Sequence, residues 1–159
     1  MEPRTILCRL LLLFWSLYFS LVTASNLVDG FQALGIAPPS WTFTSGNCAL
    51  IAETVATYGL SSGFAAFLFV CVILIELAVA LLFWIALRDS WRAAENSSGK
   101  IIRAFVPAIG LFAGFIVADE LFIVYHRTPG LETGHFLVLC ALLLSWLVID
   151  SSWRMGRVE

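Results

Sequence analysis

Five side chains that could carry acid–base or metal chemistry stand close together in one stretch of the chain. Asp119 and Glu120 are adjacent inside an apolar run, and His126, Glu132 and His135 follow within a few positions. Carboxylates and imidazoles bind transition metals and transfer protons. However, the stretch holds a single Glu-x-x-His motif, whereas di-iron bundles combine two such motifs with two further Glu. We therefore expect a rim of hydrogen-bonded side chains without a cofactor, and the alternative is a metal site formed by Asp119, His126, Glu132 and His135.

The composition places these side chains in a membrane protein. The chain is 60% hydrophobic and 13% charged, whereas soluble domains are about a quarter charged. The net charge of -2 and the lack of a basic run in the sequence exclude nucleic acid as a partner. The cysteines show no CxxC spacing, so we expect neither a disulfide framework nor a zinc site.

Four apolar stretches approach the roughly 20 residues that a helix needs to cross the hydrocarbon core. Strand patterns are absent from the sequence, and an open sheet edge is not stable in lipid. The sequence therefore predicts an all-α fold, a four-helix transmembrane bundle that forms one domain over residues 1–159. The expected spans cover residues 6–24, 64–87, 101–125 and 133–151.

The segment between the first two spans, residues 30–62, is expected to form an outer loop with structure of its own. Asn47 is a suitable N-cap for a short helix ending before Gly59. Cys48, Val55 and Tyr58 would share one face of it, so we predict an amphipathic helix lying on the membrane surface.

The basic residues predict the orientation of the chain. If both termini and the loop 88–100 lie on one side, that side holds eight of the nine Lys and Arg residues, and only Arg127 lies opposite. The positive-inside rule then places both termini in the cytoplasm of a multi-pass protein of the cell inner membrane. The eight residues are Arg4, Arg9, Arg88, Arg92, Lys100, Arg103, Arg154 and Arg157.

The first span has two interpretations. Residues 1–25 have the basic start, apolar middle and small-residue end of a signal peptide. Ser16, Ser20 and Thr23, on the other hand, fall on one face of a helix, which is typical of helix contact within a bundle. We expect retention, and cleavage remains the alternative.

The depth of the ionisable residues predicts a polar layer. Glu76 is the one charged residue between positions 63 and 87, close to the middle of the second span, where a charge costs at least ~2.5 kcal/mol. Counting along the other spans places further polar side chains in one outer layer above it. We predict an outward-facing pocket, with Glu76 as its floor and a mouth formed by Asn26, Asp29, Asp119, Glu120 and His135.

These candidate ligand- or ion-binding residues also have a structural interpretation. Polar contacts between helices hold membrane bundles together. Glu76 would then bond a serine or a backbone carbonyl, while the outer acids would bond Thr23, Asn26 and His135. The third span also carries a ridge of small residues, Gly110, Gly114 and Ala118, which predicts close packing against another helix.

Short motifs in this chain resemble a bacterial family of predicted small four-span integral membrane proteins of unknown function. They are Asn26-Leu27-Val28-Asp29 closing the first span, Glu76 within the second span, and Asp119-Glu120-Leu121-Phe122 near the end of the third. The resemblance implies a shared architecture and a shared outer polar layer, and it implies no activity.

The most economical function is that of an accessory or binding subunit. The sequence shows no phosphate-binding loop, nucleophile elbow or internal repeat. We expect the lipid bilayer as one partner and another membrane protein, or a second copy of the chain, as the other. Two alternatives remain: a membrane enzyme or redox component that binds a metal or a small polar substrate, and a component of ion- or proton-coupled transport.

Overall fold

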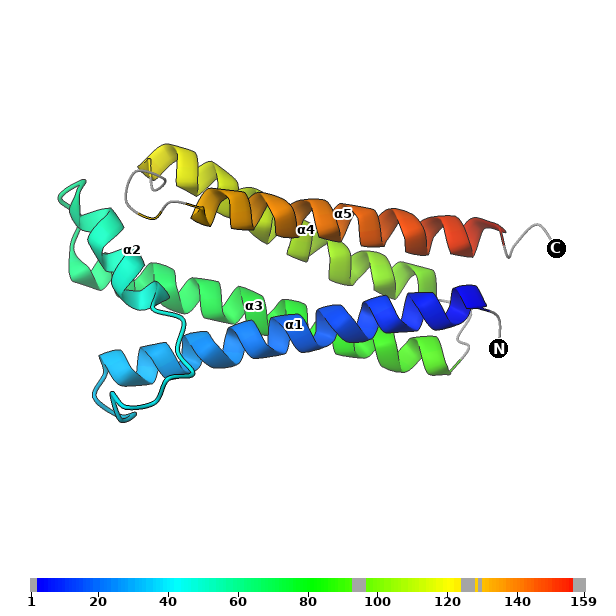
Figure 1. Cartoon of the computed structure of the whole chain (residues 1–159), viewed down its shortest axis with the longest axis horizontal. Coiled ribbons are helices and arrows are strands. Elements are labelled where there is room, and N and C mark those ends of the chain that lie inside the picture. Colours follow the sequence, from blue (N-terminus) through cyan, green and yellow to red (C-terminus); the bar gives the residue numbers. More distant parts are fainter. Residues whose placement is uncertain (1–2, 93–96, 124–127, 129, 156–159) are drawn as a thin grey trace. The chain divides into compact units, whose positions relative to one another are not determined.

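All regular secondary structure in the described part of the chain is α-helical. The computed structural model describes residues 3–92, 97–123, 128 and 130–155, and within these ranges it contains five α-helices and no strand (Figure 1). This confirms the predicted all-α fold. The helices are α1 (Pro3–Ala33), α2 (Asn47–Ala56), α3 (Ser62–Trp91), α4 (Ser97–Phe122) and α5 (Leu131–Met155).

Four of these helices, α1, α3, α4 and α5, are long and apolar enough to cross a membrane. The chain is therefore a multi-pass membrane protein with the four long helices expected of a transmembrane bundle. The short helix α2 follows α1 and precedes α3 along the chain, as predicted.

The helices extend beyond the spans predicted from hydropathy. Helix α1 ends at Ala33 rather than at residue 24, so the expected outer loop begins later than residue 30. Counting apolar residues locates only the part of a helix that matches the hydrocarbon core, and turns with polar side chains beyond it escape the count. Tyr125, His126 and Arg127 lie outside the described residues.

The start of α2 differs from the prediction. Gly46, in the left-handed conformation with φ 75°, is the N-cap and has no side chain to bond the helix, and Asn47 is the first helical residue. Val55 is buried as predicted, whereas Tyr58 is exposed and lies beyond the end of the helix. The side chain of Asn47 suggested an N-cap at that residue. The left-handed backbone conformation, which glycine adopts most easily, places the N-cap one residue earlier, at Gly46.

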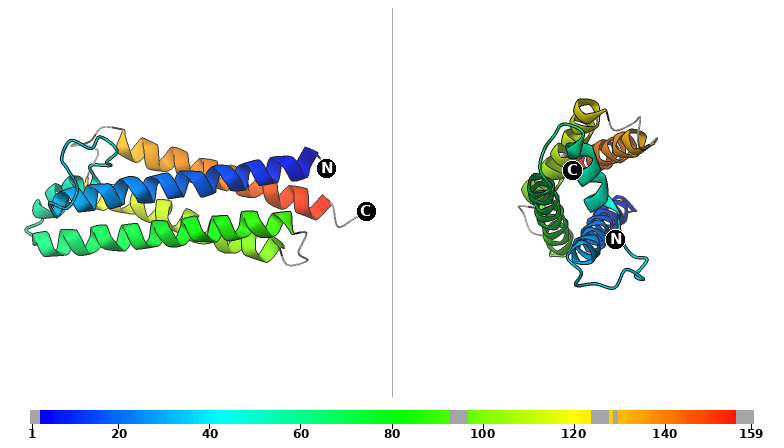
Figure 2. Two further views of the ribbon diagram at one scale, coloured as in Figure 1. Left: turned by 90° about the horizontal axis from the view of Figure 1, so that it is seen from below. Right: turned by 90° about the vertical axis from the view of Figure 1, so that its left-hand side faces the viewer.

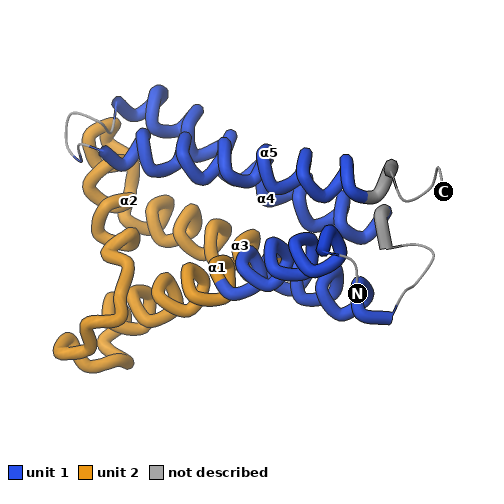
Figure 3. The backbone as a smooth tube through the Cα atoms, turned by 45° about the vertical axis from the view of Figure 1, so that its right-hand side comes forward, with its two compact units in different colours: residues 1–17, 79–159 blue, residues 18–78 orange. Residues whose placement is uncertain are grey.

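The described contacts group the chain into two compact units (Figure 3). Unit 1 comprises Met1–Leu17 and Val79–Glu159, and unit 2 comprises Tyr18–Ala78. Helices α1 and α3 are continuous across this division, so each contributes one half to unit 1 and the other half to unit 2.

Unit 1 has an aromatic core. Helices α4 and α5 pack side by side in it (Figures 1 and 2). The ring of Phe83 lies 5.0 Å from that of Phe105, which in turn lies 5.8 Å from that of Trp146. Trp15 stacks on Phe83 and donates its indole N–H to Ser145 Oγ over 3.0 Å. This bond satisfies the one polar atom of a large buried ring.

Unit 2 is built around the second half of α1 and the first half of α3. Phe19, Val55 and Phe69 are buried in it. Gly30 lies against the ring of Phe69, because a Cβ at this position would stand 3.4 Å from Phe69 Cε1. The small residue thus allows α1 and α3 to approach each other closely here.

The small-residue ridge on α4 is uncovered. Gly110 and Gly114 are exposed, and a Cβ added to either would meet no atom of another described element within 4 Å. The predicted close packing is therefore absent among the residues that the structure describes. The ridge lies on the opposite side of α4 from the buried Asp119, since a turn of 100° per residue separates them by half a revolution.

Candidate functional site

The centre of unit 2 is a chain of hydrogen bonds that leads to a buried acid. Asn26 on α1 donates from Nδ2 to Glu76 Oε2 on α3 over 2.7 Å, and its Oδ1 accepts from Asn47 Nδ2 on α2 over 2.9 Å. Asn26 is fully buried and Glu76 is 3% exposed, whereas Asn47 is half-buried. The amide of Asn26 therefore has a fixed orientation, set by a donor on one side and an acceptor on the other.

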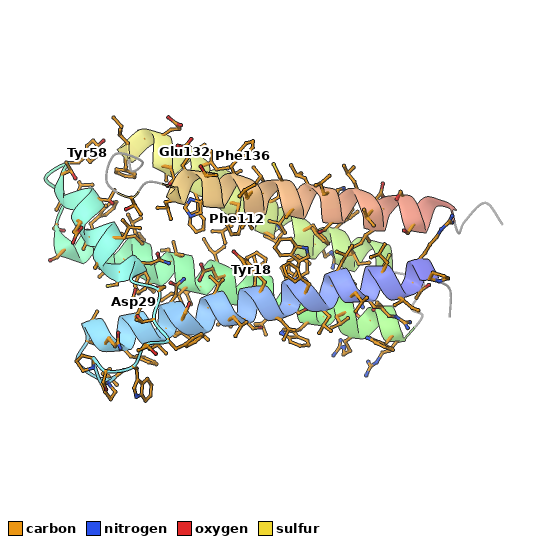
Figure 4. The ribbon with its side chains drawn as sticks, viewed as in Figure 1. Tyr18, Asp29, Tyr58, Phe112, Glu132 and Phe136 are labelled. Carbon is orange, nitrogen blue, oxygen red and sulfur yellow. The ribbon has the colours of Figure 1, made fainter. Side chains whose placement is uncertain are left out.

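A second acid of unit 2 supports the start of α2. Asp29 Oδ2 accepts from the backbone N–H of Cys48 over 2.8 Å and from Ser45 Oγ over 3.0 Å. Asp29 lies beside the segment that leads into α2 (Figure 4). The first N–H groups of a helix have no partner within the helix, and an acid is favoured at this positive end. Asp29 on α1 thus takes the capping role that Gly46 cannot fill.

The same contact affects the thiol of Cys48. Burial raises the pKa of this thiol above its usual value, and the nearby negative charge of Asp29 raises the pKa further. Both effects disfavour the thiolate, because burial penalises any charge and Asp29 repels a second negative one. Cys48 is consequently a poor nucleophile at neutral pH.

The hydroxyl group of Thr23 was expected to bond an outer acid, but it bonds within its own helix, as does that of Ser16. Thr23 donates to the carbonyl oxygen of Phe19 over 2.7 Å, and Ser16 donates to that of Leu12 over 2.7 Å. Both bonds lie within α1. In an apolar environment the carbonyl one turn earlier is the nearest acceptor for such a hydroxyl, so this local bond satisfies the side chain.

Unit 1 contains a third buried acid of the predicted layer, and here the partner is an imidazole. Asp119 Oδ2 on α4 lies 2.6 Å from His135 Nδ1 on α5, and the Asp119 side chain is 6% exposed. Phe115 and Phe112 flank the imidazole, with ring centroids 4.9 Å and 6.0 Å from it. Phe112 extends from α4 on the side where α5 lies (Figure 4). A carboxylate and two rings thus hold the imidazole in one orientation.

This arrangement determines which nitrogen of His135 is available. A carboxylate at Nδ1 favours the tautomer that carries its proton there and leaves the lone pair on Nε2. The His135 side chain is 20% exposed, and Nε2 forms no hydrogen bond within the described part of the chain. An oriented imidazole with a free lone pair can accept a hydrogen bond or bind a metal ion.

The remaining candidate residues do not join this pair. Glu120 is exposed, and Glu132 is half-buried in the first turn of α5 (Figure 4), where an acid is favoured by the helix dipole. His126 and Arg127, the expected counter-ion of Glu120, lie outside the described residues. Among the residues that are described, no three His, Cys, Asp or Glu side chains converge as metal ligands would.

No family model, curated protein or solved structure matches the chain. The resemblance to a family of small four-span membrane proteins therefore stays a prediction. What the chain does must be inferred from its own geometry.

The structure thus joins two pairs of the six predicted site residues. Asn26 is bonded to Glu76 within unit 2, where Asp29 also lies, and Asp119 is bonded to His135 within unit 1, where Glu120 also lies. The outward-facing pocket expected from all six draws on both units and stays a prediction. Sequence reasoning missed Ser45 and the bridging role of Asn47, because neither a loop residue nor the first residue of a short helix has a periodicity that indicates which way it points.

Proposed function

We propose that this protein is an accessory subunit of the cell inner membrane that binds a helix of another membrane protein along α4. The observation that carries the proposal is the uncovered ridge of Gly110 and Gly114. Between membrane helices there is no hydrophobic driving force, so association depends on close van der Waals packing, and glycines permit the closest approach.

The residues around the ridge support this interpretation. Val106 and Val117, which flank the two glycines on the same face, are 62% and 67% exposed. Together with Leu121 they form an apolar surface with a glycine groove at its centre, into which the side chains of a second helix would fit.

Charge favours a different protein over a second copy as the occupant. Arg103 is exposed near the start of α4, on the side of the glycine ridge. Two copies inserted in the same direction and paired along this ridge would bring Arg103 near Arg103. Like charges at close range are unfavourable, whereas a foreign helix need not bring a like charge to this position.

Co-purification tests the proposal. We expect the native protein, gently solubilised from its own membrane, to retain one constant companion, and Gly114→Leu to lose it because the added side chain fills the groove. Ala141→Leu is the matched control, since Ala141 is also small and exposed but lies on α5. Loss with both variants, retention with both, or a companion that proves to be a second copy of the chain would contradict the proposal.

The orientation completes the proposal: both termini lie in the cytoplasm. It is supported by the unequal distribution of the nine basic residues. A membrane-impermeant thiol reagent should label Ser40→Cys in intact cells and Ser151→Cys only after lysis, because both positions are exposed and belong to opposite ends of the predicted topology. The reverse pattern would invert the orientation.

A second function is favoured by the Asp119 and His135 pair. Histidines that bind metals usually donate their other ring N–H to a carboxylate, and His135 Nδ1 is held in this way. The chain would then be a membrane redox component or enzyme that binds a metal ion at His135 Nε2. Elemental analysis distinguishes the two functions: about one metal per chain, lost in His135→Ala, would favour the second.

A further inference from the structure

One end of unit 1 gathers basic residues from three helices, namely the start of α1, the end of α3 and the start of α4, which we call the basic end. Arg9 donates from Nη2 to the carbonyl oxygen of Ser90 over 2.8 Å, and its guanidinium lies 4.2 Å from the centre of the Trp91 ring. Lys100 Nζ contacts Asp89 Oδ2 over 2.6 Å. These contacts join α1 to α3 and α3 to α4, so the three helix ends lie together (Figure 3).

The described acid of this cluster is already shared by two bases. Asp89 Oδ2 contacts Lys100, Asp89 Oδ1 contacts Arg88 Nε at 3.3 Å, and the Asp89 side chain is 5% exposed. Its single negative charge therefore does not balance the positive charge of the basic end. Three arginines of the basic end, Arg4, Arg92 and Arg103, are exposed and form no side-chain hydrogen bond or ion pair within the described part of the chain.

We propose that the basic end binds the phosphate groups of anionic phospholipids through Arg4, Arg92 and Arg103. A guanidinium presents a planar fork of N–H groups that matches two phosphate oxygens, so each of these exposed arginines can hold a headgroup at this end. Basic residues next to a membrane span gain about 1 kcal/mol each from anionic lipid, which is roughly fivefold in binding.

The surroundings of these arginines favour a lipid over a soluble anion. Arg103 lies within the membrane-crossing stretch of α4, next to the exposed Ile102. A headgroup held at Arg103 would therefore continue into acyl chains that lie along an apolar helix surface. Trp91, which is 61% exposed, adds an aromatic ring of the kind that is enriched at the membrane–water interface.

Lipid titration of the whole purified protein tests this inference, which does not rest on the proposed partner of α4. The protein in neutral detergent is titrated with phosphatidylglycerol or phosphatidylcholine, and bound lipid is counted by native mass spectrometry while the thermal unfolding temperature is followed. We expect binding to prefer phosphatidylglycerol. The variant Arg4→Gln/Arg92→Gln/Arg103→Gln should lose roughly 100-fold of this preference, and Arg103→Gln alone about fivefold.

Two controls make the test specific. The triple Arg→Lys variant keeps the charges but loses the planar forks, so its preference should fall between that of the native protein and that of the triple Gln variant. Arg127→Gln removes one charge at the end that the sequence places opposite, and it should leave the preference unchanged. Equal binding of both lipids, an unchanged preference in the triple Gln variant, or full replacement of the lipid effect by inorganic phosphate would overturn the inference.

Discussion

Two of the four buried acids described in the long helices, Glu76 and Asp119, are held by partners of different chemistry. Glu76 in unit 2 accepts a hydrogen bond from the Asn26 amide, which cannot change its charge, whereas Asp119 in unit 1 pairs with His135, which can. The first pair is almost fully enclosed, and the second has a partly exposed imidazole. An amide fixes a geometry and little else, while an oriented imidazole can also bind a ligand or a proton. We therefore expect Glu76 to be primarily structural, and His135 is the better candidate for chemistry.

Removing the amide should have the largest effect. Asn26→Ala leaves the Glu76 carboxyl buried without its donor, so we expect the free energy of unfolding to fall by about 2 kcal/mol. Unfolding by sodium dodecyl sulfate in mixed micelles measures this loss. Ser25→Ala is the matched control, because Ser25 bonds only to the Val22 carbonyl in its own helix, and it should change stability by less than about 0.5 kcal/mol.

A double variant sharpens the same point. When Asn26 and Glu76 are both replaced by leucine, neither polar group is left unsatisfied, so the loss should be smaller than the sum of the two single losses. Additive losses would mean that the two side chains do not depend on each other, and the description of Glu76 as structural would fail.

The contact of Asp29 with α2 should have the next largest effect. Loss of a capping side chain costs about 1 kcal/mol, so Asp29→Ala should loosen α2 and accelerate amide hydrogen exchange at Cys48 and the residues that follow it. Asp29→Asn keeps an acceptor oxygen and should behave nearly as the native protein. If exchange in α2 were unaffected by Asp29→Ala, this acid would not be its cap.

The imidazole pair should contribute less to stability than the amide pair. Hydrogen bonds between membrane helices are worth about 0.6 kcal/mol on average, and His135 is partly exposed, so we expect a loss of this size for His135→Ala. The unfolding measurement used for Asn26→Ala gives a direct comparison. A loss for His135→Ala as large as that for Asn26→Ala would remove the distinction between the two acids.

The smallest effect concerns the Cys48 thiol. Burial is the main reason for its raised pKa and the charge of Asp29 is the second, so Asp29→Asn should lower this pKa only in part. A lower pKa increases the thiolate fraction at neutral pH, and alkylation of Cys48 should become faster, by less than about tenfold. Slower alkylation in this variant would show that Asp29 does not act on the thiol through its charge.

The sequence predicted the element types and the enclosed position of Glu76 well, because both follow from counting. Apolar runs identified the four long helices, and the position of Glu76 within its run identified it as an enclosed acid. Which side chain meets it depends on how each helix is rotated about its axis. For that reason the sequence did not predict the bond from Asn26 to Glu76 or the bridge from Asn47. The bond between Asp119 and His135 was among the expected contacts.

Rotation also explains why the glycine ridge was misjudged. A small-residue pattern predicts that some helix packs there, but it does not state whether this helix belongs to the same chain. In the described part of this chain the ridge of α4 is uncovered. The pattern is therefore evidence for a partner only once the structure shows which contacts are absent.

The most direct test of the proposed accessory function is photo-crosslinking in the native membrane from single sites on two faces. A photoreactive residue at Val117 lies on the glycine ridge of α4, and one at Leu137 lies on α5 with nearly the same exposure, 67% and 63%. We predict one discrete crosslinked protein from Val117, abolished by Gly114→Leu, and lipid adducts alone from Leu137. Lipid adducts alone from both positions would contradict the proposal that α4 binds a partner helix.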